Sequence, residues 1–350
     1  MNVVIVTGSS GLIGSAAVER FCSAAKLVVG IDNNYRERFF GSAASTNETA
    51  AKLVRSYSNF IHAPIDITNH EDIAELFQHY GSDISAVIHC AAQPSHDWAK
   101  NDPYLDFSIN VAATVNLLES CRNFSPQAPF AYCSSNKVYG DQPNKLPLID
   151  IGERLEIDAE HIYFEKGINE SMSIDQSTHS LFGAGKASAD LYVQEYGKYF
   201  GMHTACFRGG CLTGKAHAGA QLHGFLSFLV KQITSRNKYT VFGYGGKQVR
   251  DNIDASDVVE MFVEFVKAPR CGEVYNIGGG RGNSCSVREA ITLIEEISNI
   301  SCDFSISDAA RVGDHAWYIS DTSKFESHYP DWKKKKTLRV ILEEMVSVQL

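Results

Sequence analysis

The chain has 350 residues, of which 44% are hydrophobic and 21% are charged, and its formal net charge is −9. This length suggests two domains, or one large α/β unit with an added lobe, and gives ample chain for a buried core. The acidic balance argues against nucleic acid or an anionic membrane as a partner, because both favour a basic protein face.

Cysteine usage and hydropathy limit the compartment and the cofactors. The nine cysteines are scattered, with no CxxC pair and no Cys/His cluster at zinc-ligand spacing, which predicts free thiols and no metal site. The N-terminal apolar run is too short for a signal peptide, and no stretch approaches the roughly 18 apolar residues of a membrane span. We therefore expect a soluble, cytoplasmic protein.

Short apolar runs alternate with longer amphipathic stretches over the first part of the chain, as in βαβ units. The pattern predicts a Rossmann-type α/β fold, in which a doubly wound parallel sheet carries helices on both faces. We expect strands at Val3–Thr7, Leu27–Asp32, Phe60–Pro64, Ala86–Cys90, Phe130–Ser134 and Thr204–Arg208. We expect helices at Leu12–Ala25, His70–Tyr80, Asp106–Phe124, Ala184–Phe200 and Leu222–Ser235.

The sequence pattern changes after Arg208, where glycine-rich loops separate shorter predicted elements. We therefore assign residues 1–208 to a dinucleotide-binding domain, with a segment near 250–278 returning to it. Residues 209–350 form mainly a smaller C-terminal α/β lobe for the substrate. The irregular stretch from Asp141 to Thr178 is interpreted as a loop on the substrate side.

Residues 7–14, T-G-S-S-G-L-I-G, follow the first predicted strand and open the first helix. In this context the first glycine allows a tight turn, the second lets the backbone approach a pyrophosphate, and the third permits close helix packing. The helix N-terminus then offers N–H groups and positive potential to phosphates. The predicted cofactor residues of this turn are Gly8, Ser10, Gly11, Leu12, Ile13 and Gly14.

Acidic residues end the second and third predicted strands. Asp32, with Asn33 beside it, is placed to accept hydrogen bonds from the adenosine ribose, and its charge would repel a 2′-phosphate. This favours NAD over NADP as the cofactor. Asp66 and Ile67 are expected beside the adenine.

Several further segments carry a family resemblance that extends over most of the chain. They are H-C-A-A-Q at 89–93, Asn110, S-S-N-K-V-Y-G at 134–140, K-Q-V-R-D at 247–251 and N-I-G-G at 276–279. Together with the glycine spacing they resemble the extended short-chain dehydrogenase/reductase family. More narrowly, the segments at 135–141 and 245–251 resemble CDP-paratose (CDP-tyvelose) 2-epimerases.

The resemblance implies an NAD-dependent epimerase that acts on a nucleotide-diphosphate sugar, a CDP-sugar above all, through a transient ketosugar. It implies that Ala91, Ala92, Gln93, Asn110 and Lys186 line the cofactor. It also implies a homodimer, formed through the helix that carries the lysine and its neighbour at Asp106–Phe124.

One position departs from the family pattern. The family's Tyr-x-x-x-Lys places a proton-transferring phenol one helical turn before a lysine. Lys186 is present here, but Phe182 stands at the tyrosine position, and Gly185 replaces the usual serine. Three explanations are open: a natural phenylalanine with another base, an engineered Tyr→Phe change, or a protein that binds without turnover.

Another base must reach the reacting hydroxyl directly or through one water. Ser135 matches the family's catalytic serine, which orients and relays rather than removing a proton unaided. Lys137 is our first choice for a replacement base. Other candidates from segments expected to face the cleft are His96, Tyr163 and Cys211.

Arginines are the natural ligands of a sugar-nucleotide diphosphate, because a guanidinium binds phosphate in bidentate fashion. Arg250 and Arg311 are therefore predicted substrate residues, together with Ser135, Asn136 and Asn276. One alternative function is an NDP-sugar dehydratase. Hexose 4,6-dehydratases of the family carry Asp-Glu where this chain has Asn136 and Lys137, which argues against the common type. The second alternative is a catalytically silent sugar-nucleotide-binding protein.

Overall fold

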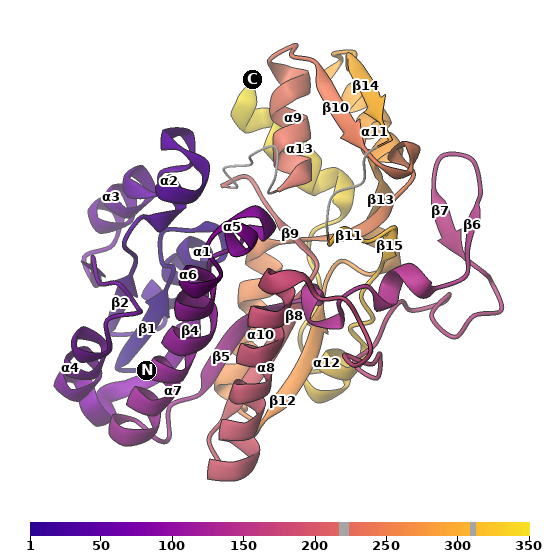
Figure 1. Ribbon diagram of the computed structural model, residues 1–350. Coiled ribbons are helices and arrows are strands. Elements are labelled where there is room, and N and C mark those ends of the chain that lie inside the picture. The colour runs from indigo at the N-terminus through magenta and orange to yellow at the C-terminus, as the bar shows by residue number, and fades with distance from the viewer. Residues whose placement is uncertain (217–223, 309–312) are drawn as a thin grey trace. The chain divides into compact units, whose positions relative to one another are not determined.

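Short β-branched runs form a parallel sheet in this computed structural model, whose described residues are 1–216, 224–308 and 313–350 (Figure 1). Within these ranges the seven-stranded sheet has the order β12-β8-β5-β4-β1-β2-β3. Strand β1 pairs in parallel with both β2 and β4, so the sheet is wound outward in two directions from its centre. The strands are β1 (Val3–Thr7), β2 (Leu27–Ile31), β3 (Phe60–Ala63), β4 (Ile84–His89), β5 (Phe130–Ser135), β8 (Thr204–Gly209) and β12 (Glu273–Ile277).

Helices cover both faces of this sheet. One apolar cluster joins strand residues such as Ile5 and Val87 to Phe77, Leu117 and Val193, which come from α4, α7 and α8. The helices of this region are α1 (Leu12–Cys22), α2 (Tyr35–Phe40), α3 (Asn47–Ser56), α4 (His70–Tyr80), α5 (His96–Asn101), α6 (Pro103–Phe107), α7 (Ala113–Phe124), α8 (Ser180–Phe200) and α10 (Ala255–Lys267). All five residues of β1 are buried, as expected for a strand covered on both faces.

Contacts divide the chain into two compact units. Unit 1 comprises Met1–Val138, Leu181–Arg208 and Val259–Tyr275, and unit 2 comprises Tyr139–Ser180, Gly209–Val258 and Asn276–Leu350. The sequence-based boundaries placed 139–180 with the first domain, whereas these residues pack within unit 2. The long-range contacts of that stretch, such as Ile168 bridging to Ser320, are not visible in a sequence.

Unit 2 contains smaller sheets and a helical layer. Its helices bury one apolar cluster that includes Leu229, Ile291 and Leu342. Strands β13, β11 and β15 lie side by side, and β9 also pairs with β11. The strands are β6 (Leu148–Asp150), β7 (Leu155–Ile157), β9 (Cys211–Thr213), β10 (Tyr239–Phe242), β11 (Val249–Asp254), β13 (Ser284–Ser286), β14 (Phe304–Ser307) and β15 (Trp317–Tyr318). The helices are α9 (Phe225–Thr234), α11 (Val287–Ser298), α12 (Ser323–His328) and α13 (Leu338–Gln349).

The parallel, doubly wound sheet with flanking helices confirms the predicted fold class. Among the described residues, no helix is both long enough and apolar enough to cross a membrane.

Candidate functional site

The turn between β1 and α1 has no room for a side chain at Gly8 or Gly14, but it has room at Gly11. Gly8 has a φ of +64°, and a Cβ there would lie 2.8 Å from the backbone nitrogen of Ala91. A Cβ on Gly14 would lie 2.0 Å from the Gly8 carbonyl oxygen, so neither position admits a side chain. A Cβ on Gly11 would approach only that carbonyl oxygen, at 3.3 Å. The space beside Gly11 is therefore available to a ligand.

Unpaired polar groups gather at this turn. Gly11 caps α1 without a side-chain hydrogen bond, and the first turn of the helix carries no acidic residue. The first N–H groups of the helix and its positive dipole end consequently stay available to an anion. The Ser9 and Ser10 hydroxyls are buried, and within the described residues they have no hydrogen-bond partner. These features fit a pyrophosphate.

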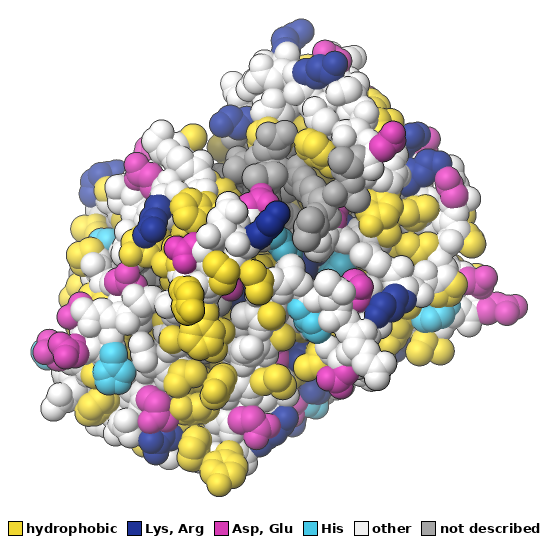
Figure 2. Space-filling model, viewed as in Figure 1, with side chains coloured by type: hydrophobic (Ala, Val, Ile, Leu, Met, Phe, Trp, Pro, Cys, Tyr) yellow, Lys and Arg dark blue, Asp and Glu magenta, His cyan; other side chains and the backbone are white. Residues whose placement is uncertain are grey.

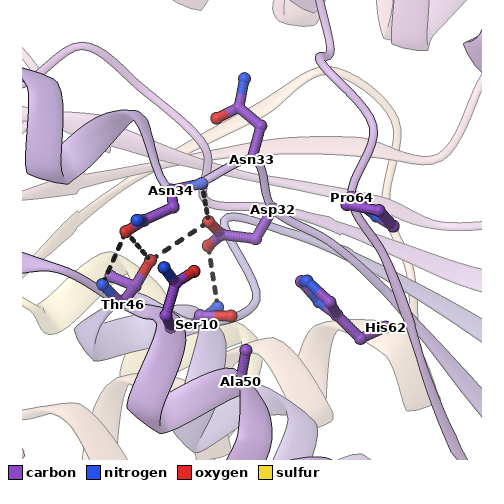
Figure 3. A pocket seen from close by; sticks show the side chains of 9 residues that line it. Ser10, Asp32, Asn33, Asn34, Thr46, Ala50, His62 and Pro64 are labelled. Atoms are coloured by element: carbon purple, nitrogen blue, oxygen red, sulfur yellow. Dashed lines mark hydrogen bonds between the residues drawn. The ribbon is translucent and has the colours of Figure 1, made fainter.

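A pocket of about 140 Å³ lies at the end of β2, around Asp32 (Figure 3). The Asp32 carboxylate accepts hydrogen bonds from the Ser10 nitrogen at 3.0 Å and from the Asn34 nitrogen at 2.9 Å. The Thr46 hydroxyl lies 3.4 Å from the same carboxylate. These bonds fix the carboxylate at the wall of a polar pocket, as ribose recognition requires. The lining is Ser10, Asp32, Asn33, Asn34, Thr46, Asn47, Ala50, His62 and Pro64.

Asp66 and Ile67 do not line this pocket. Asp66 accepts hydrogen bonds from the nitrogen and the hydroxyl of Thr68, at 2.9 and 2.8 Å. Ile67 is buried in the apolar cluster of unit 1. Their predicted contact with adenine stays a prediction.

Asn110 fastens the turn that follows β4. It sits in a π-helical turn at Ser108–Ala112, between α6 and α7. Its side-chain oxygen accepts from the Gln93 nitrogen at 3.0 Å, and its Nδ2 donates to the Gln93 carbonyl, also at 3.0 Å. This reciprocal pair holds the segment containing Ala91, Ala92 and Gln93 in one conformation.

Hydrogen bonds of the buried His89 link the end of β4 to β1 and to α7. Its Nδ1 lies 2.7 Å from the Thr7 hydroxyl, and its Nε2 lies 3.0 Å from the Thr114 hydroxyl. Thr114 donates its proton to the Asn110 carbonyl, so His89 Nε2 carries the hydrogen and Nδ1 accepts from Thr7. Burial, and then the charge of Lys186, lower the pKa of His89 to about 3. A neutral imidazole therefore joins three elements.

Lys186 is buried at the carboxyl end of β5. Its Nζ donates to the Cys133 carbonyl at 3.0 Å and lies 4.4 Å from the centre of the Tyr132 ring. Burial lowers the pKa of its ammonium group. A hydrogen bond from Cys90 lowers the pKa of the Cys133 thiol, and the nearby Lys186 acts in the same direction.

Phe182 lies one turn before Lys186 on α8, and its ring packs edge-on against His96 with 4.9 Å between centroids. The structure thus brings Phe182, Lys186 and His96 into unit 1. No proton can be transferred by the phenyl ring itself.

Strand alternation separates the two serines at the end of β5. Ser134 points into the core, where its hydroxyl donates to Asp190 at 2.6 Å, and Asp190 also pairs with Arg208. Ser135 is half-buried, and its hydroxyl accepts from the Lys137 nitrogen at 3.2 Å. Ser135, rather than Ser134, is therefore the serine left for a ligand. Asn136 is buried and belongs to the same 3₁₀ turn as Lys137.

The predicted substrate residues of unit 2 lie mainly within its protein contacts. Arg250 pairs with Asp314 through Nη2, and its Nη1 donates to the Val249 carbonyl at 2.7 Å. Asn276 is fully buried, and its amide binds the Tyr139 hydroxyl at 2.7 Å and the Ile168 carbonyl at 2.9 Å.

The remaining candidates are placed as follows. Tyr163 is buried in unit 2, and Cys211, which starts β9, is half-buried in the same unit. Arg311 lies outside the described residues. The structure does not test a functional role for any of these three residues, so each role stays a prediction.

Two features of unit 1 were not found from the sequence. The Thr7–His89–Thr114 chain joins residues up to 107 positions apart, which no local pattern reveals. Asp106 binds both Gln93 and Asn110. Its spacing of four residues before Asn110 is the only local signal of this contact, and the sequence analysis did not use it.

Comparison with known proteins places these features in context. Residues 4–278 match the model of the NAD dependent epimerase/dehydratase family. The chain is 29% identical to CDP-paratose 2-epimerase of Salmonella typhi, over 98% of this chain and 97% of that protein. It is 25% identical to a dTDP-glucose 4,6-dehydratase of Neisseria meningitidis serogroup B, over 85% and 77% of the two chains.

A solved structure shares the fold over nearly the whole length. It is a Tyr-to-Phe mutant of UDP-glucuronic acid 4-epimerase from Bacillus cereus, in complex with UDP-4-deoxy-4-fluoro-glucuronic acid and NAD. The match has a TM-score of 0.79 and 25% sequence identity, and it covers 99% of this chain and 98% of the other.

Proposed function

Because this chain belongs to the NAD-dependent epimerase/dehydratase family, we propose that it is an NAD-dependent epimerase of a nucleotide-diphosphate sugar, and specifically of a CDP-sugar. The observation that carries this proposal is one arrangement within unit 1. It combines a glycine turn with space beside Gly11, two buried serine hydroxyls without a partner among the described residues, the Asp32 pocket, and Lys186 at the end of β5. These residues fit a dinucleotide whose reactive end lies near Lys186.

When bound, NAD supplies the redox chemistry, by taking a hydride from a sugar carbinol and returning it to the other face of the transient ketosugar. The protein's part begins with binding. The N–H groups at the start of α1 and the serines of the turn hold the pyrophosphate, with Leu12 and Ile13 in the first helical turn. Asp32 and Asn33 hold the adenosine ribose, and Asp66 and Ile67 flank the adenine.

The other end of the cofactor is held by the turn at Ala91, Ala92 and Gln93, which Asn110 fixes. The buried Lys186 binds there and contributes positive charge next to the reacting hydroxyl. Ser135 orients that hydroxyl. Phe182 fills the place of the family's phenol and leaves proton transfer to another group.

We assign that proton transfer to Lys137, which shares a turn with Asn136 directly after Ser135. An amine can accept the hydroxyl proton as the hydride departs and return it afterwards. His96, Tyr163 and Cys211 are second choices. For the nucleotide sugar, we assign Arg250 and Arg311 to the diphosphate, and Asn136 and Asn276 to the shape of the site.

A dehydratase function is the nearest alternative within the family, as the similarity to dTDP-glucose dehydratases indicates. The Asn136–Lys137 pair favours the epimerase, since elimination needs an acid and a base at those two positions. Phe182 keeps a silent binding protein as a further alternative.

We also propose that the chain works as a homodimer in the cytoplasm. Large apolar side chains are exposed along α6 and α8, where Figure 2 shows a gathering of hydrophobic side chains. They include Tyr104 at 87%, Phe107 at 56% and Leu191 at 45% exposure, and exposed apolar side chains that lie together often mark a protein interface. All nine cysteines are free, in keeping with a reducing compartment.

The decisive experiment offers CDP-sugars to the NAD-loaded protein. We expect transient absorbance of reduced nicotinamide, formation of the C2 epimer, and no deuterium from solvent at the carbon beside the carbinol. Solvent deuterium at that carbon would instead support a dehydratase. Nucleotide-sugar binding without any nicotinamide reduction, in both the wild type and Phe182→Tyr, would refute an enzymatic function.

A further inference from the structure

The proposed mechanism gives no role to the buried ion pair between Asp190 of α8 and Arg208 of β8. Arg208 donates to Asp190 through two nitrogens, with Nε 3.1 Å from Oδ2 and Nη2 2.7 Å from Oδ1. Asp190 is 1% exposed and Arg208 is 5% exposed. Because the cost of burying two charges offsets most of their attraction, stability alone does not explain such a pair.

Asp190 also holds the strand that carries the candidate catalytic serine. Its Oδ2 accepts the Ser134 hydroxyl at 2.6 Å, and its Oδ1 accepts from Gln194 Nε2 at 2.8 Å. Each carboxylate oxygen therefore accepts two hydrogen bonds, which hold the carboxylate in one orientation. Because Ser134 lies on β5, Arg208 on β8 and Gln194 on α8, the carboxylate ties three elements together.

The hydrogen bond from Ser134 fixes the peptide group that receives Lys186. Lys186 Nζ donates to the carbonyl of Cys133, the residue directly before Ser134, at 3.0 Å. The same ammonium group lies 4.4 Å from the centre of the Tyr132 ring. Lys186 and Asp190 are four residues apart on α8, so they project from the same face of the helix.

Two further effects of Asp190 act in the same sense. Burial lowers the pKa of the Lys186 ammonium group, and the negative charge of Asp190 raises it. Successive side chains of a strand point to opposite faces, so a Ser134 hydroxyl held in the core keeps Ser135 on the ligand side. The carboxylate thus lies behind both groups that the proposed mechanism places at the reacting hydroxyl.

We propose that Asp190 is a positioning residue for the reactive end of the site, and that it acts through Ser134. With Arg208 as its anchor, Asp190 fixes the end of β5. The Cys133 carbonyl is then held against the Lys186 ammonium group, and Ser135 stays directed toward the ligand. The effect on turnover rests on the proposed function, whereas the placement of Lys186 does not.

Ser134→Ala tests this path, because it removes the link from Asp190 to β5 and leaves the pair with Arg208 intact. In NAD-loaded protein with ¹³C-labelled lysine, the Tyr132 ring current should shift the terminal methylene signal of Lys186 upfield. Lys186→Met identifies that NMR signal by its absence. We expect Ser134→Ala to lose most of the upfield shift, and Ser134→Thr, which keeps the hydroxyl, to retain it.

Ser125→Ala is the matched control. Ser125 is another buried serine of unit 1, and its hydroxyl donates to the Gly81 carbonyl at 2.7 Å. Ser125→Ala should lower the urea midpoint about as much as Ser134→Ala does, since each loses one buried hydrogen bond, and should leave the Lys186 signal in place. A wild-type Lys186 signal in Ser134→Ala would overturn the proposal, as would a wild-type signal without an upfield shift.

Turnover measurements separate this inference from the proposed function. With a CDP-sugar, Ser134→Ala should lower kcat about tenfold with KM nearly unchanged, because a small displacement of a reacting group slows the chemistry more than the binding. Ser134→Thr should recover the wild-type kcat. A shifted Lys186 signal with unchanged kcat would refute the role of Asp190 in turnover. A wild type without turnover, but with the expected NMR differences, would refute the epimerase and leave the placement of Lys186 by Asp190 standing.

Discussion

At the scale of single residues, the chemistry of unit 1 depends on which groups can hold a proton. Phe182 holds none, and His89 is kept neutral by burial and by the nearby charge of Lys186. Lys186 is buried against a carbonyl oxygen and an aromatic ring. The position at which the family resemblance predicts a phenol therefore carries no oxygen in this chain.

Restoring that oxygen is the first prediction. Phe182→Tyr should raise the rate of nicotinamide reduction by a CDP-sugar about 10²-fold, because a positioned general base contributes an effect of this size. Stopped-flow absorbance measures the rate. Phe200→Tyr, at the exposed end of the same helix, is the matched control and should change nothing. A slower reaction or a different product would mean that the phenylalanine belongs to a mechanism of its own.

The second prediction concerns pH and stability. In the folded protein His89 stays neutral down to about pH 3, whereas in the unfolded chain it binds a proton below about pH 6.5. Between these values the unfolded state holds more protons, so the free energy of unfolding falls as the pH falls, by up to roughly 5 kcal/mol.

Urea unfolding at a series of pH values measures this effect. We expect His89→Gln to lose stability at neutral pH, by about 1–3 kcal/mol, and to show a flatter decline below pH 6.5. His79→Gln, on the exposed face of α4, should keep the wild-type slope. An equal slope in wild type and His89→Gln would show that the imidazole is not held neutral.

At the scale of elements, the conformation of the β1–α1 turn depends directly on its glycines. These glycines differ in the space that surrounds them. Gly14 has no room for a methyl group against the Gly8 carbonyl, while Gly11 has room on the protein side. Substitutions at these two positions should therefore have different consequences.

Gly14→Ala should destabilise the fold by about 1–3 kcal/mol or more, because the added methyl group overlaps backbone. Gly11→Ala should keep the wild-type stability to within about 0.5 kcal/mol and weaken NAD binding at least about tenfold, since the methyl group fills the pyrophosphate space. Urea unfolding and NAD titration by fluorescence check the two effects. A Gly11→Ala protein that binds NAD as tightly as the wild type would place the pyrophosphate elsewhere.

The spacing of apolar residues in the sequence predicted those helices and strands that have a continuous apolar face. The strand at Val3–Thr7 and the helix at His70–Tyr80 have the expected bounds. Helix α3 was not predicted, because only Ala50 and Leu53 are buried in it, too few for a recognisable stripe. Helix α8 begins at Ser180, four residues before the predicted start, so that Phe182 and Lys186 share one helix.

The candidate site was predictable where its residues are close in sequence. The glycine turn and Asp32 belong to one βαβ unit, and Ser10 of that turn lines the same pocket as Asp32. The contact between Asp106 and Gly185 was not predictable, because the two residues are far apart in the chain. Contacts between elements, rather than patterns within them, decide such cases.

At the scale of the whole molecule, the proposed dimer leads to a prediction about the exposed apolar side chains on α6 and α8. We expect the wild type to have twice the chain mass of 38.5 kDa in light scattering. The double variant Leu191→Asp, Tyr192→Asp should become monomeric, because two charges would be buried in an apolar interface. Val348→Asp, an exposed position on α13, should stay dimeric. A wild-type monomer would refute the predicted dimer.

Unit 1 is formed by three separate stretches of the chain, so its strands are not all synthesised one directly after another. Its sheet receives β12 only after about 70 further residues have followed β8, since Gly209–Val258 belongs to unit 2. At the usual pace of about 5–20 residues per second, a ribosome needs several seconds for that stretch. During those seconds β8 is an open sheet edge, and open edges recruit other strands. The nascent chain is then most dependent on chaperones, and a chain released before Glu273 should aggregate rather than fold.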